Sequence, residues 1–163
     1  MTLGELNALD AAAAERELLR CCGSARWARA VAAARPFASV DALIAAGDRA
    51  ADALAPADWL EAFAAHPRIG SSGGADRSRD WSAQEQSGVA MATRTVTERL
   101  AARNRDYETR FGYIFIVCAT GRSAGEMLAM LERRLTNDPA SELRVAADEQ
   151  RKITRLRLAK LLS

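Results

Sequence analysis

Residues that start and stop helices recur along almost the whole sequence, and they constrain the fold more than any other feature. Thr2 with Glu5 forms a capping box, which pairs side chains with the unbonded N–H groups of a first helical turn. Alanine, which has the highest helix propensity, makes up more than one residue in five. These signals predict a short helix after Thr2 and longer ones over about 11–22, with Gly23 as the stop, over 24–35, from Ser39 or Asp41 onward, and over 56–66, 82–107, 123–135 and 139–162.

Two segments do not follow this helical pattern. Residues 70–80 are small and polar with several glycines, which is typical of a loop. Residues 113–119 form an apolar run that is strand-like in composition but has no visible partner strand. The chain has 163 residues, 49% of them apolar, which suits one domain with a sizeable core. The predicted fold class is therefore all-α: a single domain over 1–163, built as a bundle of about seven to nine helices with one buried extended segment near 113–119.

Charge and hydropathy exclude several classes of protein. The 23 basic and 21 acidic residues nearly cancel and are interspersed, so no basic block predicts a nucleic-acid surface. No apolar run reaches about 18 residues, the length that predicts a transmembrane helix. Glu5 and Asp10 stand where a signal peptide has a basic start. We therefore expect a cytoplasmic protein that binds neither nucleic acid nor a membrane.

Metal-ligating residue types are too few and too poorly spaced for a metal site. Cys21 and Cys22 are adjacent, Cys118 stands alone, and His66 is the only histidine. This set matches neither a zinc site nor a disulfide framework. We expect no metal and a reducing compartment.

His66 is the candidate for proton transfer. Histidine is the side chain whose unperturbed pKa, about 6.5, lies near neutrality. His66 follows an apolar helical pattern and precedes Pro67, and a residue before proline is pushed away from helical geometry. We therefore expect His66 at a helix end that faces a loop. The alternative is a surface histidine that only ends a helix.

Two arginines occupy positions where a positive charge is unfavourable unless a partner or a ligand neutralises it. Arg157 shares the inner stripe of the last predicted helix with Ala146, Gln150 and Ile153, and a buried guanidinium needs a carboxylate or a ligand. An internal ion pair and a side chain that reaches the surface are the alternatives. Arg122 comes just before a predicted helix start, where the helix dipole disfavours a cation unless an anion lies between them. The alternative is an exposed arginine beyond the reach of the dipole.

Three further residues have structural explanations beside functional ones. Glu85 is the last member of a capping box with Ser82, and Gln86 can simply be solvated. Cys118 can be a small buried apolar residue, or a nucleophile that pairs with His66.

Several short motifs occur in a fixed order between about residues 6 and 162. The most specific combination is His66-Pro67-Arg68-Ile69-Gly70 with Glu85-Gln86-x-Gly88 some twenty residues later. The others are Cys21-Cys22-Gly23-Ser24-x-x-Trp27, Arg35-Pro36-Phe37, Tyr107-x-x-x-Phe111-Gly112, Phe115-Ile116-Val117-Cys118-Ala119, Gly121-Arg122-Ser123-Ala124, Arg134-Leu135-x-Asn137 and Lys152-Ile153-x-x-Leu156-Arg157-Leu158. By these motifs the chain resembles the 2-oxo-4-hydroxy-4-carboxy-5-ureidoimidazoline (OHCU) decarboxylases of the urate-to-allantoin pathway.

The resemblance implies an all-helical enzyme, usually a homodimer, that acts on this small-molecule substrate without a cofactor. The substrate loses its carboxylate as CO₂, and protonation of the resulting carbanion on one face gives (S)-allantoin. By the same resemblance, the catalytic residues are His66, Glu85 and Arg157. The stretches that match the family's substrate contacts are Pro67, Ser82, Ala83, Gln84, Glu85, Gln86, Phe115, Ile116, Val117, Cys118 and Ala119.

These residue types suit that chemistry. An imidazole can deliver the proton, and an arginine can hold an anionic or urea-like edge with its forked N–H groups. A Glu-Gln pair offers acceptors and donors to ureido groups. Two other functions stay open from the residues alone: a thiol hydrolase that uses Cys118 and His66, and a catalytically silent helical binding protein on the same scaffold.

Overall fold

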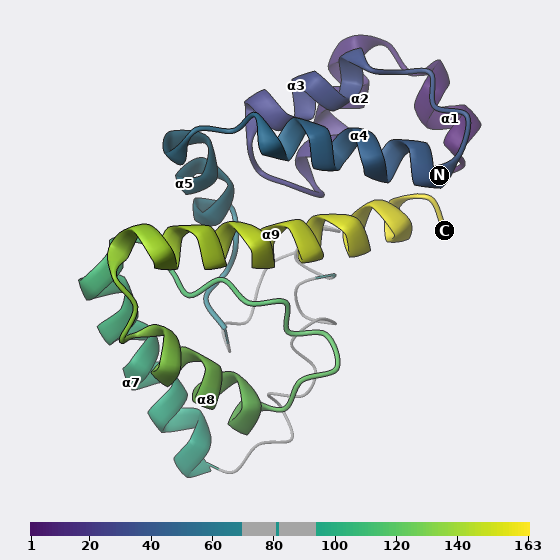
Figure 1. Cartoon of the computed structure of the whole chain (residues 1–163). Coiled ribbons are helices and arrows are strands. Elements are labelled where there is room, and N and C mark those ends of the chain that lie inside the picture. The colour runs from purple at the N-terminus through teal and green to yellow at the C-terminus, as the bar shows by residue number, and fades with distance from the viewer. Residues whose placement is uncertain (70–80, 82–93) are drawn as a thin grey trace. The chain divides into compact units, whose positions relative to one another are not determined.

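The computed structural model describes residues 1–69, Trp81 and 94–163 of the chain (Figure 1). Within these ranges all regular secondary structure is helical and there is no strand, which confirms the all-α prediction. None of these helices is both long enough and apolar enough to span a membrane. Their bounds are α1 (Leu3–Ala8), α2 (Ala11–Leu19), α3 (Ala25–Ala33), α4 (Val40–Asp52), α5 (Pro56–Ala64), α7 (Arg94–Phe111), α8 (Ala124–Arg134) and α9 (Pro139–Leu161).

The described residues form two compact units. The first contains Met1–Ala65 with Gln150–Ser163, and the second contains His66–Glu149. Helix α9 contributes its beginning to the second unit and its last part to the first. The single domain over 1–163 stays a prediction.

Side-chain caps start the helices of the first unit largely where the sequence predicts. The capping box of Thr2 with Glu5 opens α1, and Asp10 accepts the Ala13 N–H at 2.7 Å to open α2. The N-cap of α4 is Ser39, whose hydroxyl accepts the Ala42 N–H, and not Asp41. Each cap pairs a backbone donor that the first turn leaves without a partner. Local sequence therefore sets these boundaries.

Helix α2 is shorter than expected, and Gly23 plays a different part from the one predicted. The helix ends at Leu19, because Cys21 and Cys22 both donate their N–H groups to the Leu18 carbonyl in a tight turn. Gly23 does not take the left-handed conformation of a helix-stop glycine. A Cβ atom on Gly23 would instead lie 2.4 Å from the Cβ of Ala65, the residue that caps the end of α5. The missing side chain allows this close approach.

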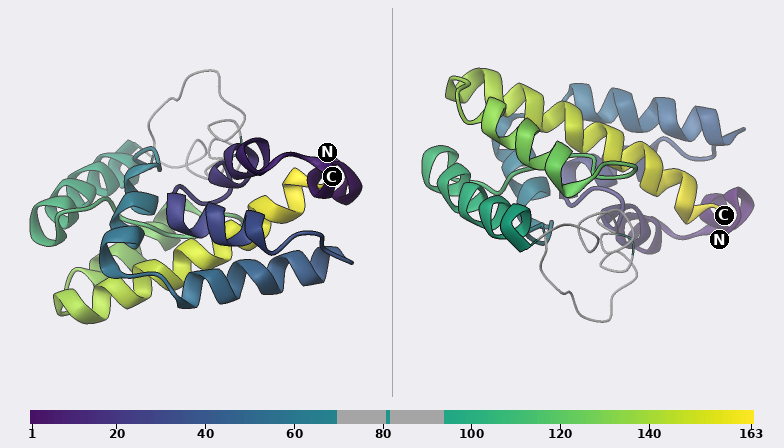
Figure 2. Two further views of the ribbon diagram at one scale, coloured as in Figure 1. Left: turned by 90° about the horizontal axis from the view of Figure 1, so that it is seen from above. Right: turned by 90° about the horizontal axis from the view of Figure 1, so that it is seen from below.

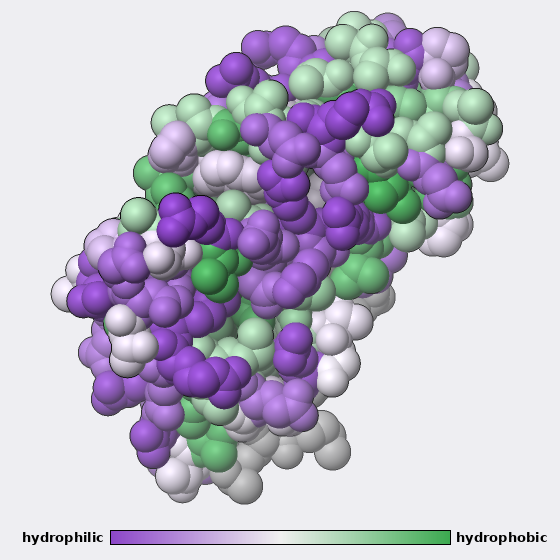
Figure 3. Space-filling model, in the orientation of Figure 1, coloured by the Kyte–Doolittle hydropathy of each residue, from purple (hydrophilic) through white to green (hydrophobic). Residues whose placement is uncertain are grey.

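The last part of α9 packs against α4 in the first unit (Figure 2). Arg155 donates two hydrogen bonds of 2.9 Å to the carboxylate of Asp48, and Arg151 pairs with Asp52 at 2.7 Å. Beneath these pairs, the indole of Trp27 donates to the Gly47 carbonyl at 2.9 Å. The outer surface of α9 is hydrophilic (Figure 3). Apolar packing therefore provides most of the stability, since exposed ion pairs contribute little.

The second unit contains α7, α8 and the beginning of α9, and α7 packs along α8 (Figure 1). Helix α7 continues to Phe111, beyond the predicted end near Tyr107, and Gly112 follows with φ +80°, a left-handed stop that glycine adopts readily. The predicted start of this helix near Ser82 lies outside the described residues. The core of the unit includes Leu100, Tyr107, Phe115, Val117, Ala119, Ala124, Met127, Leu128 and Leu131.

Replacing Gly23 with alanine should destabilise the first unit. The new methyl group would overlap the Ala65 side chain, and overpacking of this kind costs about 1–3 kcal/mol. Gly4→Ala is the matched control, because its Cβ would meet only Thr2 Oγ1 at 3.9 Å. Urea unfolding of both variants measures the difference. Equal unfolding midpoints would show that the close approach at Gly23 does not constrain the fold.

Candidate active site

His66 lies where the sequence predicts, directly after α5 and its C-cap residue Ala65. It is half-buried, as is Pro67, and neither belongs to a helix. The proline explains the break, because it disfavours helical geometry in the residue before it. The imidazole is therefore held at a helix end, outside an apolar packing stripe.

Residues that follow His66 line a cleft with α7. Arg68 and Ile69 form one side, and the other side is one face of α7, with a volume of about 390 Å³ between them. Arg68 pairs through Nε with Glu108 Oε1 at 2.9 Å. The residues of the α7 face are Ala101, Asn104, Arg105 and Glu108. Their three- and four-residue spacing is the signal in the sequence that could have indicated this face.

The segment 113–119 is neither helix nor strand, as predicted for an extended run without a partner strand. Phe115, Ile116, Val117 and Ala119 are buried, and Cys118 is half-buried. Such a segment lacks the internal hydrogen bonds of a helix, so side chains from elsewhere must hold it.

Arg134, at the end of α8, is the main support of this segment. Its Nη1 donates to the Ile116 carbonyl at 2.7 Å, and its guanidinium lies 4.5 Å from the centre of the Phe115 ring. Its Nε donates to Glu142 Oε1 at 2.7 Å. The Arg134 side chain is 8% exposed and that of Glu142 is fully buried. This ion pair therefore lies in the core of the second unit.

Two further side chains donate hydrogen bonds to Glu142. The hydroxyl of Tyr107 donates to its Oε1 at 2.5 Å, and Asn137 Nδ2 donates to its Oε2 at 2.9 Å. Burial, and then the hydrogen bond to Glu142, raise the pKa of Tyr107 far above its usual value, so Tyr107 stays a neutral donor. The sequence shows Arg134 and Asn137 only as parts of a motif and gives no sign of Glu142, because this partner lies on another helix.

Two more contacts hold the end of the segment. The Cys118 N–H donates to Glu149 Oε1 at 3.4 Å, and the Arg122 N–H donates to the Ala119 carbonyl at 3.0 Å. Arg122 directly precedes Ser123, the N-cap of α8, as predicted. Whether an anion lies between Arg122 and this helix start remains a prediction.

In the first unit, Arg157 lies on the inner stripe of α9, as its spacing predicts. It is 6% exposed, and Gln150 and Ile153 of the same stripe are buried too. Cys21 and Cys22 lie close enough for Arg157 to favour their thiolates, but burial dominates and raises the pKa of Cys21 to about 12 and that of Cys22 to about 11. These thiols are therefore neutral packing groups, not nucleophiles.

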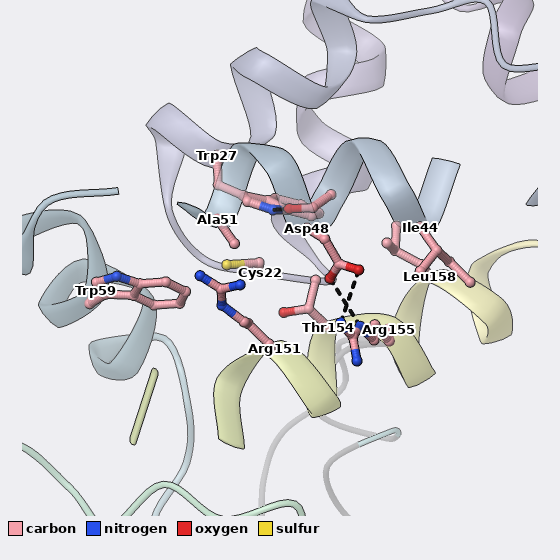
Figure 4. A pocket seen from close by; sticks show the side chains of 11 residues that line it. Cys22, Trp27, Ile44, Asp48, Ala51, Trp59, Arg151, Thr154, Arg155 and Leu158 are labelled. Atoms are coloured by element: carbon pink, nitrogen blue, oxygen red, sulfur yellow. Dashed lines mark hydrogen bonds and ion pairs between the residues drawn. The ribbon is translucent and has the colours of Figure 1, made fainter. Parts of the chain in front are cut away.

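The first unit also has a small cavity near α4, α5 and α9 (Figure 4). Its free volume is about 10 Å³, enough for roughly one water molecule. Figure 4 shows Arg151 between Trp59 and Cys22, with Asp48 hydrogen-bonded to Arg155. A heterocyclic substrate does not fit there, so the cleft beside α7 and the segment 113–119 are the better candidates.

The predicted site residues fall into three groups. Glu85 and its neighbours Ser82, Ala83, Gln84 and Gln86 lie outside the described residues. Of the other predicted residues, His66, Pro67 and the segment 115–119 belong to the second unit, whereas Arg157 belongs to the first. Within the described ranges, no three histidine, cysteine or carboxylate side chains cluster as metal ligands would.

Comparison with known proteins decides the family. The OHCU decarboxylase family model matches residues 7–159 of the chain. The chain belongs to the OHCU decarboxylase family. It is therefore a decarboxylase, a lyase, as its motifs predict.

Individual members of the family resemble the chain over most of its length. A crystal structure of OHCU decarboxylase in the presence of (S)-allantoin superposes with a TM-score of 0.79 at 38% identity, over 90% of this chain and 96% of that one. The 2-oxo-4-hydroxy-4-carboxy-5-ureidoimidazoline decarboxylase of Haloferax volcanii is 30% identical over 100% of this chain and 97% of its own length. The uric acid degradation bifunctional protein TTL of Arabidopsis thaliana is 43% identical over 91% of this chain, which spans 47% of that protein.

The buried cysteine pair should make stability fall with pH in the alkaline range. Above pH 9 the unfolded chain releases the thiol protons, whereas the folded chain keeps them up to about pH 11–12, so alkaline pH favours unfolding. Each thiol contributes a slope of up to about 1.4 kcal/mol per pH unit. Urea unfolding between pH 9 and 11 should therefore show a shallower loss of stability for the Cys21→Ala, Cys22→Ala double variant. Parallel pH profiles would contradict the burial of these thiols.

Proposed function

We propose that the chain converts OHCU to (S)-allantoin in urate degradation, without a cofactor and with His66 as general acid/base. Membership of the OHCU decarboxylase family supports the reaction. The position of His66 is the main support for its role in proton transfer. His66 is the chain's only histidine, and it is half-buried at a helix end, next to the residues that line the cleft.

The reaction asks three things of the protein. It must hold the scissile carboxylate out of the plane of the ring, stabilise the charge that develops, and deliver one proton to one face. When CO₂ leaves, the electron pair of the broken C–C bond moves into the adjoining C=N and C=O groups. Protonation of the neighbouring ureido-bearing carbon, with loss of the hydroxyl proton as the carbon that lost CO₂ becomes a carbonyl, then completes the product. A neutral-range acid such as imidazole suits the last step.

The other proposed roles follow from the type and the setting of each residue. Arg157 is buried on α9, so its fork is fixed by packing and can hold an anionic or urea-like edge. Pro67 and the backbone of Phe115–Ala119 contact the substrate, and Glu85 with Gln86 binds its ureido groups. The tight support of 115–119 by Arg134 favours this role, because a preorganised backbone loses little freedom when it binds a ligand.

We also propose that the protein works as a homodimer in the cytoplasm. The family resemblance supports the dimer. All three cysteines are free thiols, which is consistent with a reducing compartment.

His66→Asn should abolish enantioselective allantoin formation while leaving the helical circular dichroism unchanged. Loss of a general acid/base costs about 10²–10⁴-fold in rate. OHCU is made in situ from urate, and circular dichroism follows optically active allantoin, since spontaneous decay gives the racemate. Ala64→Asn, an exposed neighbour on α5, is the control and should behave as wild type. Turnover by His66→Asn within a few-fold of the control would show that another group moves the proton.

Arg157→Lys and Arg122→Lys should separate the two arginines. The lysine at position 157 keeps the charge but loses the fork, so KM should rise about 10-fold or more, as expected for loss of a charged hydrogen bond. Arg122 is half-buried before α8, and its lysine variant should stay within about 3-fold of wild type, since a contribution of local electrostatics there is small. KM, kcat and Tm of both variants are the measurement. If Arg157→Lys has wild-type kinetics and Arg122→Lys loses most of its activity, the residue that binds the anion is Arg122 and not Arg157.

A further inference from the structure

The backbone between Phe115 and Ala119 is held at a few defined atoms. The Ile116 carbonyl accepts from Arg134 at 2.7 Å, and the Cys118 N–H donates to Glu149 at 3.4 Å. Both side chains are buried, Arg134 at 6% exposure and Glu149 at 3%. These two anchors flank a single residue, Val117.

Planar trans peptide bonds then fix where the polar groups of Val117 point. Across such a bond, the carbonyl of one residue and the N–H of the next point in opposite directions. The bonds on both sides of Val117 are trans. The Val117 N–H therefore points away from the carbonyl that Arg134 binds, and the Val117 carbonyl points away from the N–H that Glu149 binds.

These two groups of Val117 have no partner among the residues that the structure describes. Val117 is only 6% exposed, and buried backbone groups without partners cost free energy. A donor and an acceptor on one residue match a ligand edge in which N–H and C=O stand side by side, as in a urea or a cyclic ureide.

The anchors are themselves fixed by the rest of the unit. Glu142 binds Arg134, and Tyr107 and Asn137 donate to Glu142. The Arg134 guanidinium also covers the Phe115 ring, which leaves it little freedom to move away from Ile116. The direction of the Val117 peptide groups is therefore set by side chains from α7, α8 and α9.

We propose that Arg134 and Glu149 are positioning residues for the decarboxylation. They hold the Ile116 carbonyl and the Cys118 N–H, so that the N–H and C=O of Val117 face the ureide edge of the substrate. This inference rests on the proposed function, and it adds two side chains that do not touch the substrate themselves. Their loss changes how the ring is held and hence which face of the carbanion receives the proton.

The proposal is tested by measuring KM, kcat and enantiomeric excess for two variants, each with a control variant at the adjacent residue. Arg134→Lys keeps the positive charge beside Glu142, but a lysine lacks the forked guanidinium that binds Glu142 and the Ile116 carbonyl together. Glu149→Ala removes the acceptor of the Cys118 N–H. Arg133→Lys and Asp148→Ala are the matched controls, because both residues are exposed neighbours on the same helices. We expect both test variants to raise KM at least 5-fold, with a smaller change in kcat, and to lower the enantiomeric excess of allantoin. The controls should match wild type.

A binding measurement gives a readout that does not depend on turnover. The chain has six valines, so ¹⁵N-valine labelling yields few amide signals, and Val117→Ile identifies the one from Val117 by its disappearance. Titration with (S)-allantoin should shift the Val117 amide in the wild type. The shift should fall by at least half in Arg134→Lys and Glu149→Ala, and should persist in both controls.

The outcomes separate this inference from the proposed function. Folded test variants with the KM, enantiomeric excess and Val117 shift of wild type would overturn the positioning role while the decarboxylase assignment stands. An active wild type whose Val117 amide does not respond to (S)-allantoin would do the same, even where a test variant fails to fold. A wild type that makes no excess of (S)-allantoin would overturn the proposed function, and the positioning role with it.

Discussion

The second unit depends on the buried ion pair between Arg134 and Glu142. A pair of this kind returns little net stability, because both charges lose their hydration, but removal of one partner costs about 3–5 kcal/mol. Here Glu142 accepts hydrogen bonds from Arg134, Tyr107 and Asn137. The pair therefore fixes the geometry of α7, α8 and α9 within the unit more than it adds to stability.

Through Arg134, the same pair allows a non-helical backbone inside an all-helical protein. A helix satisfies its own N–H and C=O groups and offers few of them to a ligand. In the segment 113–119, Arg134 binds the Ile116 carbonyl and Glu149 binds the Cys118 N–H, so side chains do part of the pairing that a helix does internally. A polar heterocycle with several donors and acceptors suits such a surface.

The buried polar groups of the two units differ in charge: the first unit buries neutral thiols, and the second buries an ion pair. In the first unit burial keeps Cys21 and Cys22 neutral beside Arg157. In the second unit a carboxylate and a guanidinium share the core with a tyrosine whose proton is held tightly. The charged groups of the second unit thus act through fixed hydrogen bonds, and the thiols of the first unit act through packing.

The sequence by itself determined the helical class, most helix starts, the position of His66 at a helix end, and the family. The family rests on motifs along the whole chain, whereas the other features are local: a cap at Asp10 or Ser123, or a proline after His66, acts on its own neighbours in the chain. The tertiary structure decided the partner of Arg134, the support of Ile116 and Cys118, and the reason for Gly23. Glu142 lies eight residues from Arg134 on another helix, and Ala65 lies 42 positions from Gly23, so no local pattern reports such contacts. They arise only when packing brings distant segments together.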